Sequence, residues 1–542
     1  MLFRFYGHLS RKNADASFMN VSRHYAKAVA NARRKENVTI DNQAKNKKGR
    51  IPIITCKNNI YNFYKGDTFN KKQPMLVSRG WKSKNSRGDH FVIHPYSNND
   101  QEEIQNDSET FKDLNLSSST CNILESHLNI HKPLEIQTLG IPKILQGHNV
   151  LLAAETGCGK TLAYLLPLID KILEWKQVVQ RDMNTPLGLI VTPSRELTVQ
   201  IALELIKLTK HLNIKIKLIT GGRTKRVILD PPVGHVDILV GSFGVVSKLS
   251  TFGVYNLKFV RFVVLDEADA LFHYTFDQKL KVFLEKLPIG YFQEISQNGF
   301  PNTAQLILVS ATIPQRLENV LSVVVNPQSL QHVTTEKLHK ILVPQKFMRV
   351  ISSQKPVELL KYIKPKVLSK QRVIVFTNHN STSYWLYAFL QKCGINATNL
   401  NGDMPLHVRQ GKYGEFLNGK TLVLSTTNGG SRGLDTLMVN HILNYDFPLD
   451  TAAYIHRCGR TGRVGTVGDS KVTNFICRQA EAVVVQKIEM AARKMTPIPI
   501  FNLLERGREA GEEKEEEEEE EEEPEYMNEI IENLENSENI PY

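Results

Sequence analysis

The sequence predicts an α/β protein with two tandem domains, each built on a parallel sheet flanked by helices. Short β-branched runs alternate with amphipathic stretches, which is typical of strands alternating with helices. The runs form two consecutive sets, and 542 residues are too many for one core of about 100–200 residues. We expect domains at 105–335 and 336–508, a disordered basic extension at 1–104 and a disordered acidic tail at 509–542.

Each apolar run is short enough to form one strand. The runs of the first domain are 149–154, 187–192, 236–240, 260–266 and 304–310. Those of the second domain are 372–377, 420–426, 439–445 and 469–475. Because ligands gather at the carboxyl ends of the strands in doubly wound sheets, we expect functional residues directly after these runs.

The composition argues against a metal-stabilised, disulfide-linked or membrane-inserted protein. The six cysteines are far apart, with no C-x-x-C pair and no histidine cluster at zinc spacing. We therefore expect reduced thiols, no disulfide partner and no structural metal. Since no run of about 18 apolar residues is present, we expect no membrane insertion.

Charge is distributed unevenly along the chain. The net charge is +12, but residues 509–542 carry 17 acidic residues and one basic residue, Lys514. That segment has a net charge of −16, so the rest of the chain carries +28. Such a surplus favours a polyanionic partner, because Lys and Arg that neutralise phosphates release counterions.

The expected N-terminal extension permits two interpretations. No acidic residue precedes Asp15, and Leu, Phe and Tyr are interspersed with Arg and Lys, as in a mitochondrial presequence. The second interpretation is a basic terminus that binds RNA weakly or directs the chain to the nucleus through Arg33, Arg34 and Lys35.

A glycine-rich loop follows the first expected strand and leads into an apolar helix. Its residues are Ala154, Glu155, Thr156, Gly157, Cys158, Gly159, Lys160 and Thr161. Gly157 and Gly159 allow backbone N–H groups to surround phosphates at a helix N-terminus, which predicts a phosphate-binding loop. Lys160 is placed to reach the β and γ phosphates, and the Thr161 hydroxyl to ligate Mg²⁺. We interpret Cys158 as a small residue that contributes backbone, with a redox role as the alternative.

Carboxylates and arginines supply what phosphoryl transfer still needs. Asp266, at the end of a strand, suits the Mg²⁺ shell, and Glu267 suits orientation and deprotonation of the attacking water. In the second domain, Arg460 and Arg463 are suited to stabilise charge on the γ-phosphoryl group, so hydrolysis would require the domains to close. These arginines also fit a patch for RNA phosphates.

Asp266, Glu267, Ala268 and Asp269 spell the name-giving motif of the DEAD-box RNA helicases, and the chain resembles that family over about residues 108–480. The other motifs follow in the family's order. The resemblance implies two RecA-like domains that close on ATP, Mg²⁺ and RNA, and that separate RNA strands locally.

The resemblance also implies roles for individual residues. Phe111 would stack on adenine, Gln137 would read its edge, and Asp435 would hold the ribose. Four residues would couple hydrolysis to strand separation: Ser310, Thr312, Asp269 and His456. The residues implied in RNA binding are Pro193, Ser194, Arg195, Gly221, Gly222, Ser242, Gly244, Asn378 and Thr427.

Three positions depart from the family pattern. Glu135 stands where the family usually has a proline near the adenine site. Val245 stands where it has an arginine, and Asn428 where it has an aspartate. The last two changes remove charged groups from the expected RNA side and favour an alternative function, an ATP-gated RNA clamp that scaffolds ribosome assembly with little unwinding. A DNA helicase is a third alternative.

A closer resemblance, to a mitochondrial branch of the family linked to assembly of the large mitoribosomal subunit, rests on GWKS at 80–83 and DHF at 89–91. It implies single-stranded or short-duplex RNA as substrate, ribosomal RNA above all, ribosome-assembly proteins as partners, and the mitochondrial matrix as location. The nucleus or nucleolus is the alternative location.

The expected acidic tail contains twelve Glu within residues 512–525, interrupted only by Lys514 and Pro524. A like-charge run of this density repels itself and stays disordered. We interpret it as a solubilising tail, with competition against RNA for the basic cleft as the alternative.

Overall fold

The computed structural model describes residues 50–503, except 69–73, 84–85, 96–109, 222–223, 273–275, 291–295, 298, 315–316, 323, 402–403, 405, 432–433, 435 and 464–467. Most of the expected extension and the whole acidic tail therefore lie outside the described residues. Among those described, no helix combines the length and the apolar content that a bilayer-spanning segment needs.

The first domain contains a seven-stranded sheet in which every strand pair is parallel, with the order β10-β4-β9-β8-β5-β7-β6. The central strands are buried on both sides and are rich in β-branched and aliphatic residues, as parallel strands covered by helices require. The strands are β4 Val150–Ala153, β5 Gly188–Thr192, β6 Ile216–Ile219, β7 Ile238–Ser242, β8 Phe262–Asp266, β9 Gln305–Ser310 and β10 Gln331–Thr334.

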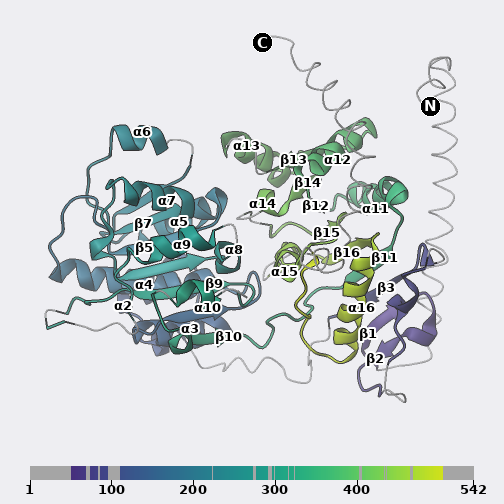
Figure 1. Cartoon of the computed structure of the whole chain (residues 1–542), viewed down its shortest axis with the longest axis horizontal. Helices are drawn as coiled ribbons and strands as arrows, with labels where there is room; N and C mark the ends of the chain where they lie inside the picture. The colour runs from purple at the N-terminus through teal and green to yellow at the C-terminus, as the bar shows by residue number, and fades with distance from the viewer. Residues whose placement is uncertain are drawn as a thin grey trace, which may run out of the picture. The chain divides into compact units, whose positions relative to one another are not determined.

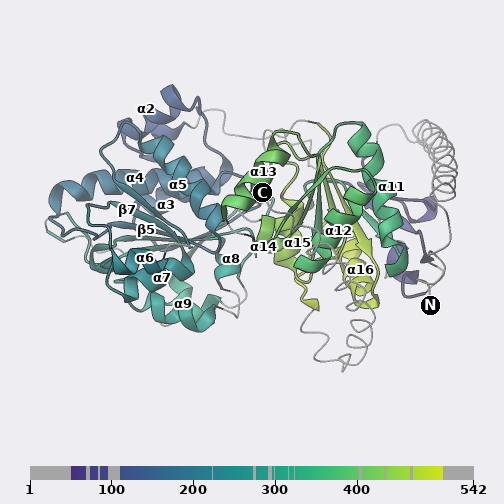
Figure 2. The same ribbon diagram turned by 90° about the horizontal axis from the view of Figure 1, so that it is seen from above.

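Helices cover both faces of this sheet. Figure 2 shows α4 and α5 on one face and α7 and α9 on the other, and the two faces belong to two separate apolar clusters. The helices are α2 Ser118–His127, α3 Glu135–Leu145, α4 Lys160–Val178, α5 Arg195–Thr209, α6 Thr224–Leu229, α7 Phe243–Thr251, α8 Ala268–Leu271, α9 Asp277–Leu284 and α10 Leu317–Leu321.

The second domain contains a nine-stranded sheet with the order β13-β14-β12-β15-β16-β11-β3-β1-β2, in which β2 is Phe63–Tyr64. Helices α11 and α12 pack on one face, and α13, α15 and α16 on the other. The elements after residue 340 are β11 Gln345–Arg349, α11 Lys355–Leu368, β12 Val373–Thr377, α12 Asn380–Lys392, β13 Ala397–Leu400, α13 Leu406–Leu417, β14 Val423–Thr427, α14 Asn428–Ser431, β15 His441–Asn444, α15 Thr451–Cys458, β16 Lys471–Ile476 and α16 Gln479–Arg493 (Figure 1). The predicted fold class is confirmed in both sheets.

Residues 50–52 and 64–68 belong to a small unit that is compact by itself. Within it, the Arg50 guanidinium pairs with Asp67 at 2.7 Å, and the Lys65 N–H donates to the Ile51 carbonyl at 2.9 Å. The Tyr64 N–H also donates to the Asp67 carboxylate at 2.9 Å. The first two contacts join the segments 50–52 and 64–68, and the third lies within a turn at 64–67.

The structure differs from the sequence expectation before residue 105, because part of the expected extension completes the second domain. Strand β3 (His90–Ile93) pairs antiparallel with β11, and β1 (Pro52–Cys56) pairs antiparallel with β3. Trp81 is fully buried and lies 5.4 Å from the Phe91 ring, which stacks on Phe347 at 5.1 Å between centroids. The apolar runs that form these strands are only four or five residues long, too short for periodicity to identify.

A buried carboxylate holds the chain between these strands to helix α16. Glu489, fully buried, accepts from the Val77 N–H at 2.9 Å and from the Ser78 hydroxyl at 2.6 Å, and it pairs with Arg493 at 2.8 Å. Arg493 also donates to the Tyr61 carbonyl at 2.8 Å. Buried charges are tolerated when they are paired and hydrogen-bonded in this way, so residues 53–63 and the described residues of 74–93 form part of the folded domain.

We expect Trp81→Ala to lower the free energy of unfolding of the second domain by about 3–5 kcal/mol, because it removes a buried aromatic side chain and leaves a cavity. Hydrogen exchange of the amides in β11 measures this loss. Ile60→Ala, in the same segment but 74% exposed, is the matched control. Equal protection in both variants would show that the segment does not stabilise the domain.

Candidate functional site

The glycine-rich loop lies between β4 and α4, at the carboxyl end of its sheet. Gly157 and Gly159 have φ angles of 84° and 87°, which residues with a Cβ rarely adopt. The Lys160 ammonium donates to the carbonyls of Ala154 and Glu155 at 2.6 and 2.7 Å, so it folds back over the loop. Thr161 follows in the first turn of α4, a 19-residue helix whose N-terminus favours an anion.

Gln137 lies against this loop. Its side chain, 2% exposed, donates to the Gly159 carbonyl at 3.0 Å and accepts from the Leu134 N–H at 2.9 Å. Phe111 begins the short 3-10 helix Phe111–Leu114 and is packed into the apolar core at 3% exposure. Adenine would therefore have to displace neighbouring side chains before it could stack on the Phe111 ring.

Cys158 is partly buried within the loop. Burial raises the pKa of its thiol, with only a smaller opposing effect from the Lys160 charge. A thiol with a raised pKa is a poor nucleophile, which favours the backbone role over the redox role.

Asp266 ends β8 with a buried carboxylate. It accepts from the Tyr164 hydroxyl at 2.9 Å and from the Glu267 N–H at 2.7 Å. Burial, followed by the neighbouring Glu267 charge, raises the pKa of Asp266 to about 6. Sequence reasoning missed Tyr164, although its position four residues after Lys160 puts both on the same face of α4.

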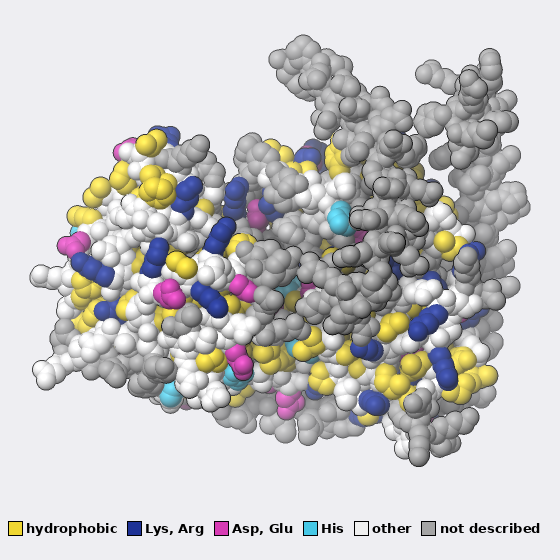
Figure 3. Space-filling model, in the orientation of Figure 1, with side chains coloured by type: hydrophobic (Ala, Val, Ile, Leu, Met, Phe, Trp, Pro, Cys, Tyr) yellow, Lys and Arg dark blue, Asp and Glu magenta, His cyan; other side chains and the backbone are white. Residues whose placement is uncertain are grey.

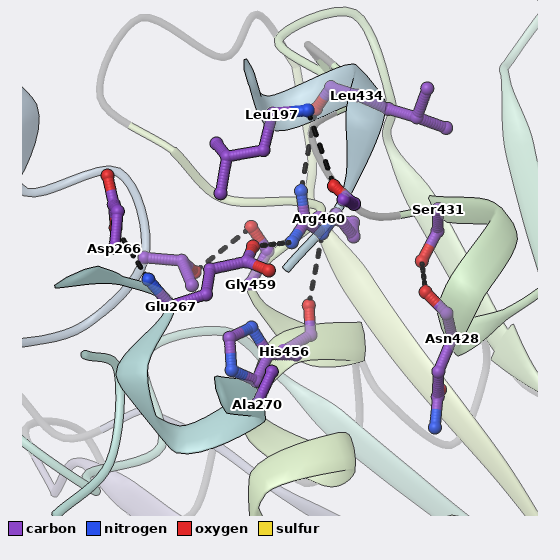
Figure 4. A network of polar contacts seen from close by, with 12 residues as sticks. Leu197, Asp266, Glu267, Ala270, Asn428, Ser431, Leu434, His456, Gly459 and Arg460 are labelled. Atoms are coloured by element: carbon purple, nitrogen blue, oxygen red, sulfur yellow. Dashed lines mark hydrogen bonds and ion pairs between the residues drawn. The ribbon is translucent and has the colours of Figure 1, made fainter. Parts of the chain in front are cut away.

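The Glu267 side chain lies close to an arginine of the second domain. Its backbone has a φ of 48°, a left-handed conformation uncommon for glutamate, and its carboxylate lies 3.9 Å from the Arg460 guanidinium. Figure 4 shows the two side chains pointing toward each other. Arg460 is fixed by donating to the carbonyls of His456 at 3.3 Å and Leu434 at 3.5 Å.

The arginine motif also touches the glycine-rich loop. The Thr156 hydroxyl donates to the Gly459 carbonyl at 3.1 Å, and Arg463 donates to the same carbonyl at 2.9 Å. A Cβ on Gly157 would lie 3.1 Å from Arg463, which limits this loop position to glycine in both shape and φ. The structure thus brings Arg460 and Arg463 to the residues predicted to hold phosphate.

The four predicted coupling residues form one cluster. The Asp269 carboxylate binds His456 at 2.9 Å and accepts from the Thr312 hydroxyl at 3.0 Å, and it also bonds to Ser310. Burial opposes the charge on Asp269, but His456 and the two hydroxyls outweigh it and hold the pKa of Asp269 below its usual range. Burial likewise opposes charge on His456, and Asp269 outweighs it, which raises the pKa of His456.

The first-domain residues implied in RNA binding occupy loops at strand ends. Ser194 caps α5 by accepting from the Leu197 N–H at 3.3 Å, and Pro193 precedes it. The Arg195 guanidinium lies against Gly221, where a Cβ would come within 2.8 Å of it. Gly222 lies outside the described residues. A further contact that the sequence did not reveal joins the domains here, the buried ion pair between Glu196 and Arg409 at 3.2 Å.

Ser242 ends β7, and Gly244 lies in the first turn of α7 with open space around its Cβ position. Val245 is 9% exposed and belongs to the apolar cluster under α7. The position at which the family has an arginine therefore points into the core in this chain.

Arg457 organises the predicted RNA side of the second domain, although it is only 1% exposed. It donates to the side chains of Asn378 at 2.7 Å and Asn428 at 2.6 Å, and to the Asp446 carbonyl at 2.7 Å. Burial lowers the pKa of Arg457 to about 10 despite nearby carboxylates. Asn428 thus faces a buried arginine rather than open solvent.

Thr427 donates to the Asn380 side chain at 3.1 Å. Asp435, expected to hold the ribose, lies outside the described residues. Figure 3 shows more Lys and Arg than Asp and Glu side chains on the described surface that it presents, in keeping with the positive surplus of the sequence. The described groups can therefore bind phosphate, polarise water and attract a polyanion.

Comparisons with known proteins identify two helicase domains in the chain. The DEAD/DEAH box helicase model matches residues 134–320, and the helicase conserved C-terminal domain model matches residues 354–465. The chain is 36% identical over 438 residues to the Mus musculus protein named "Probable ATP-dependent RNA helicase DDX28", covering 78% of this chain and 81% of that one. The Homo sapiens protein of the same name is 34% identical over 435 residues, with the same coverage.

Solved structures show the same fold. The structure of S. cerevisiae Dbp5 bound to RNA and ADP BeF3 superposes with a TM-score of 0.56 at 23% identity, covering 71% of this chain and 94% of that one. Mss116p bound to single-stranded RNA and AMP-PNP gives a TM-score of 0.59 at 22% identity, covering 75% and 81%. Both sheets are thus RecA-like domains, and the chain belongs to the DEAD-box family of ATP-dependent RNA helicases, which hydrolyse ATP.

Proposed function

We propose that this helicase assembles its hydrolytic centre from both RecA-like domains and uses the assembly to separate RNA strands locally. The observation that carries the proposal is the approach of Arg460 to Glu267, 3.9 Å apart across the two domains. Glu267 orients and deprotonates the attacking water, while Arg460 and Arg463 stabilise charge on the γ-phosphoryl group. Hydrolysis then depends on closure, and closure on bound RNA.

The phosphates of ATP lie on the backbone of the glycine-rich loop, and Lys160 leaves its two carbonyl partners to reach the β and γ phosphates. Thr161 and the buried Asp266 carboxylate suit Mg²⁺, held largely through water, because hard oxygen ligands are the ones it prefers. Mg²⁺ would supply charge neutralisation at the phosphates. Gln137 and Phe111 select adenine, and Asp435 holds the ribose.

RNA lies along both domains, with its backbone against three elements: the Ser194–Arg195 loop, the start of α7 and the end of β14. Contacts to phosphates and 2′-hydroxyls make this recognition independent of sequence and specific for RNA over DNA. The Asp269–His456 cluster couples the nucleotide state to this surface. Closure bends the bound strand, which releases its complement.

Two observations favour a second candidate function, an ATP-gated RNA clamp with little unwinding. Val245 is buried in the core, and Asn428 is engaged with Arg457, so neither presents the charge that the family pattern places near RNA. Single-turnover unwinding of a short duplex, compared with RNA affinity with and without ATP, separates the two functions. ATP-dependent affinity without strand release would establish the clamp.

We further propose that the chain acts on ribosomal RNA during assembly of the large mitoribosomal subunit, in the mitochondrial matrix, together with assembly proteins. The acid-free start of the chain and its resemblance at residues 80–83 and 89–91 to a mitochondrial branch of the family support this. Crosslinking in intact cells, followed by sequencing of the bound RNA, tests it. Recovery of nucleolar precursor RNA instead would support the alternative location.

We expect Glu267→Gln to lower ATP turnover by about 10²–10⁴-fold, because the amide cannot accept the proton of the attacking water. ATP and RNA affinity should stay unchanged. Steady-state hydrolysis and RNA binding by fluorescence anisotropy measure the two effects. Glu285→Gln, at an exposed position of the same domain, is the control. Unaltered turnover in Glu267→Gln would remove Glu267 from this role.

The Asp269–His456 pair predicts a pH dependence of domain closure. Because the pKa of His456 is raised, its contribution is complete below the usual value of about 6.5 and is lost as pH rises through the raised pKa. Because the pKa of Asp269 is lowered, its contribution is complete above the usual value of about 3.9 and is lost only as pH falls through the lowered pKa.

Closure in the presence of RNA and AMP-PNP should therefore weaken as pH rises above 6.5, and His456→Gln should flatten this profile. Energy transfer between dyes on the two domains measures closure at each pH. The account is contradicted if His456→Gln keeps the wild-type profile.

A further inference from the structure

A cluster of cationic side chains lies on the second domain, away from the motifs described above. Lys471 and His441 are the first residues of β16 and β15, and they are directly paired in the sheet. Lys346 lies on β11, the strand next to β16, and Lys366 lies in the last turns of α11. Helix α11 packs on one face of this sheet (Figure 1). We call these three lysines, Lys346, Lys366 and Lys471, the lysine cluster.

The strand register places these groups on one face of the sheet. Side chains alternate between faces along a strand, so Lys471 shares its face with Phe475, and His441 shares its face with Leu443. Both apolar residues belong to the cluster beneath α11. Lys346 pairs with Val92, so His94, two residues after Val92, belongs to the same face.

The electrostatics indicate that these charges act on one another. Burial, then Lys471 and Lys346, lowers the pKa of Lys366 to about 8. Burial, then Lys366 and Lys471, lowers the pKa of His441 to about 4, and burial and Lys471 lower that of His94. Among the described residues, the charges that shift these three groups are all lysines. An anion placed here would relieve the repulsion.

The Lys366 ammonium is held in place. It lies 3.7 Å from the centre of the Tyr362 ring and donates to the Tyr362 carbonyl at 3.3 Å. The Tyr362 hydroxyl in turn donates to the Ile442 carbonyl on β15 at 3.4 Å. Because its side chain is already ordered, Lys366 would lose little conformational freedom on binding a ligand.

The lysine cluster and the ATP- and RNA-site residues occupy opposite ends of the strands. Lys471 and His441 begin their strands, whereas Asn378 and Thr427 lie at the carboxyl ends of β12 and β14. A five-residue strand is about 16 Å long, so a ligand on the lysine cluster would not occupy the surface at the motif end.

We propose that Lys346, Lys366 and Lys471 form a second RNA contact, which binds backbone phosphates of the RNA that flanks the segment held by the two domains. Lysine binds phosphate as a point charge and suits contact without sequence preference. RNA fits better than a small anion, because three cations spread over two strands and a helix match a row of phosphates. The inference rests on the RNA-dependent activity proposed above.

The test compares two RNAs on the full chain carrying Lys346→Gln, Lys366→Gln and Lys471→Gln together. One RNA has about ten nucleotides, enough for the site between the domains, and the other is several times longer. We expect affinity for the long RNA to fall about tenfold or more. The slope of log affinity against log salt should become shallower by about 2, as three lost phosphate contacts predict. Affinity for the short RNA and the ATPase rate that it stimulates should stay unchanged.

Three controls keep the test decisive. A triple Lys→Gln variant at the exposed positions 361, 392 and 420 of the same domain has the same net charge and should bind the long RNA normally. Lys366→Arg keeps the positive charge and should retain affinity for the long RNA. This result would assign the loss in the cluster variant to missing charge and not to misfolding. A polyglutamate peptide should compete with long RNA no better on wild-type protein than on the cluster variant.

Unchanged affinity of the cluster variant for the long RNA would overturn the inference, and so would an equal loss for both RNAs. Preferential competition by polyglutamate on wild-type protein would assign the lysine cluster to an acidic peptide instead. If RNA does not stimulate ATP hydrolysis by the wild-type protein, the proposed function is refuted, and this result is distinct from the failure of the lysine cluster.

Discussion

The partly buried contact between Asp269 and His456 is the interaction on which the rest of the functional arrangement depends. It joins the carboxyl end of one sheet to helix α15 of the other domain, which directly precedes Arg460 and Arg463, at 2.9 Å. The same meeting of the domains places Arg460 3.9 Å from Glu267 and the Thr156 hydroxyl 3.1 Å from the Gly459 carbonyl. A charged pair inside protein is stable only when both partners are present. The contact therefore makes catalytic geometry a property of two domains together.

The same principle explains why the polar groups around it are so fully engaged. Arg457 is buried and donates to oxygens of Asn378, Asn428 and Asp446, which follow β12, β14 and β15. Glu196 pairs with Arg409 across the domains. Each of these two sets of contacts removes the cost of an isolated buried charge and holds a segment near the expected RNA path. Val245 and Asn428 fit this packing, because Val245 fills the apolar core and Asn428 accepts a hydrogen bond from Arg457. The local structure therefore accommodates both departures from the family pattern.

Much of the fold could be predicted because its signals are local. A few neighbouring residues are enough to recognise the apolar runs, the glycine pair at 157 and 159 and the carboxylates after β8. Tyr164, Glu196 and Glu489 could not be recognised in this way, since each acts on a group far away in the sequence. Trp81 lies in the segment 80–83 that resembles the mitochondrial branch, yet its complete burial depends on strands too short to identify by pattern.

The central claim is that the second domain completes the hydrolytic site, and single-turnover hydrolysis of pre-bound ATP by wild-type protein and Arg460→Ala tests it most directly. Saturating single-stranded RNA should accelerate hydrolysis in the wild-type protein, with single-stranded DNA far less effective. The variant should bind ATP equally well but lose this acceleration, by about 10³–10⁵-fold if Arg460 acts as an arginine finger. RNA-stimulated hydrolysis at the wild-type rate in Arg460→Ala would contradict the account.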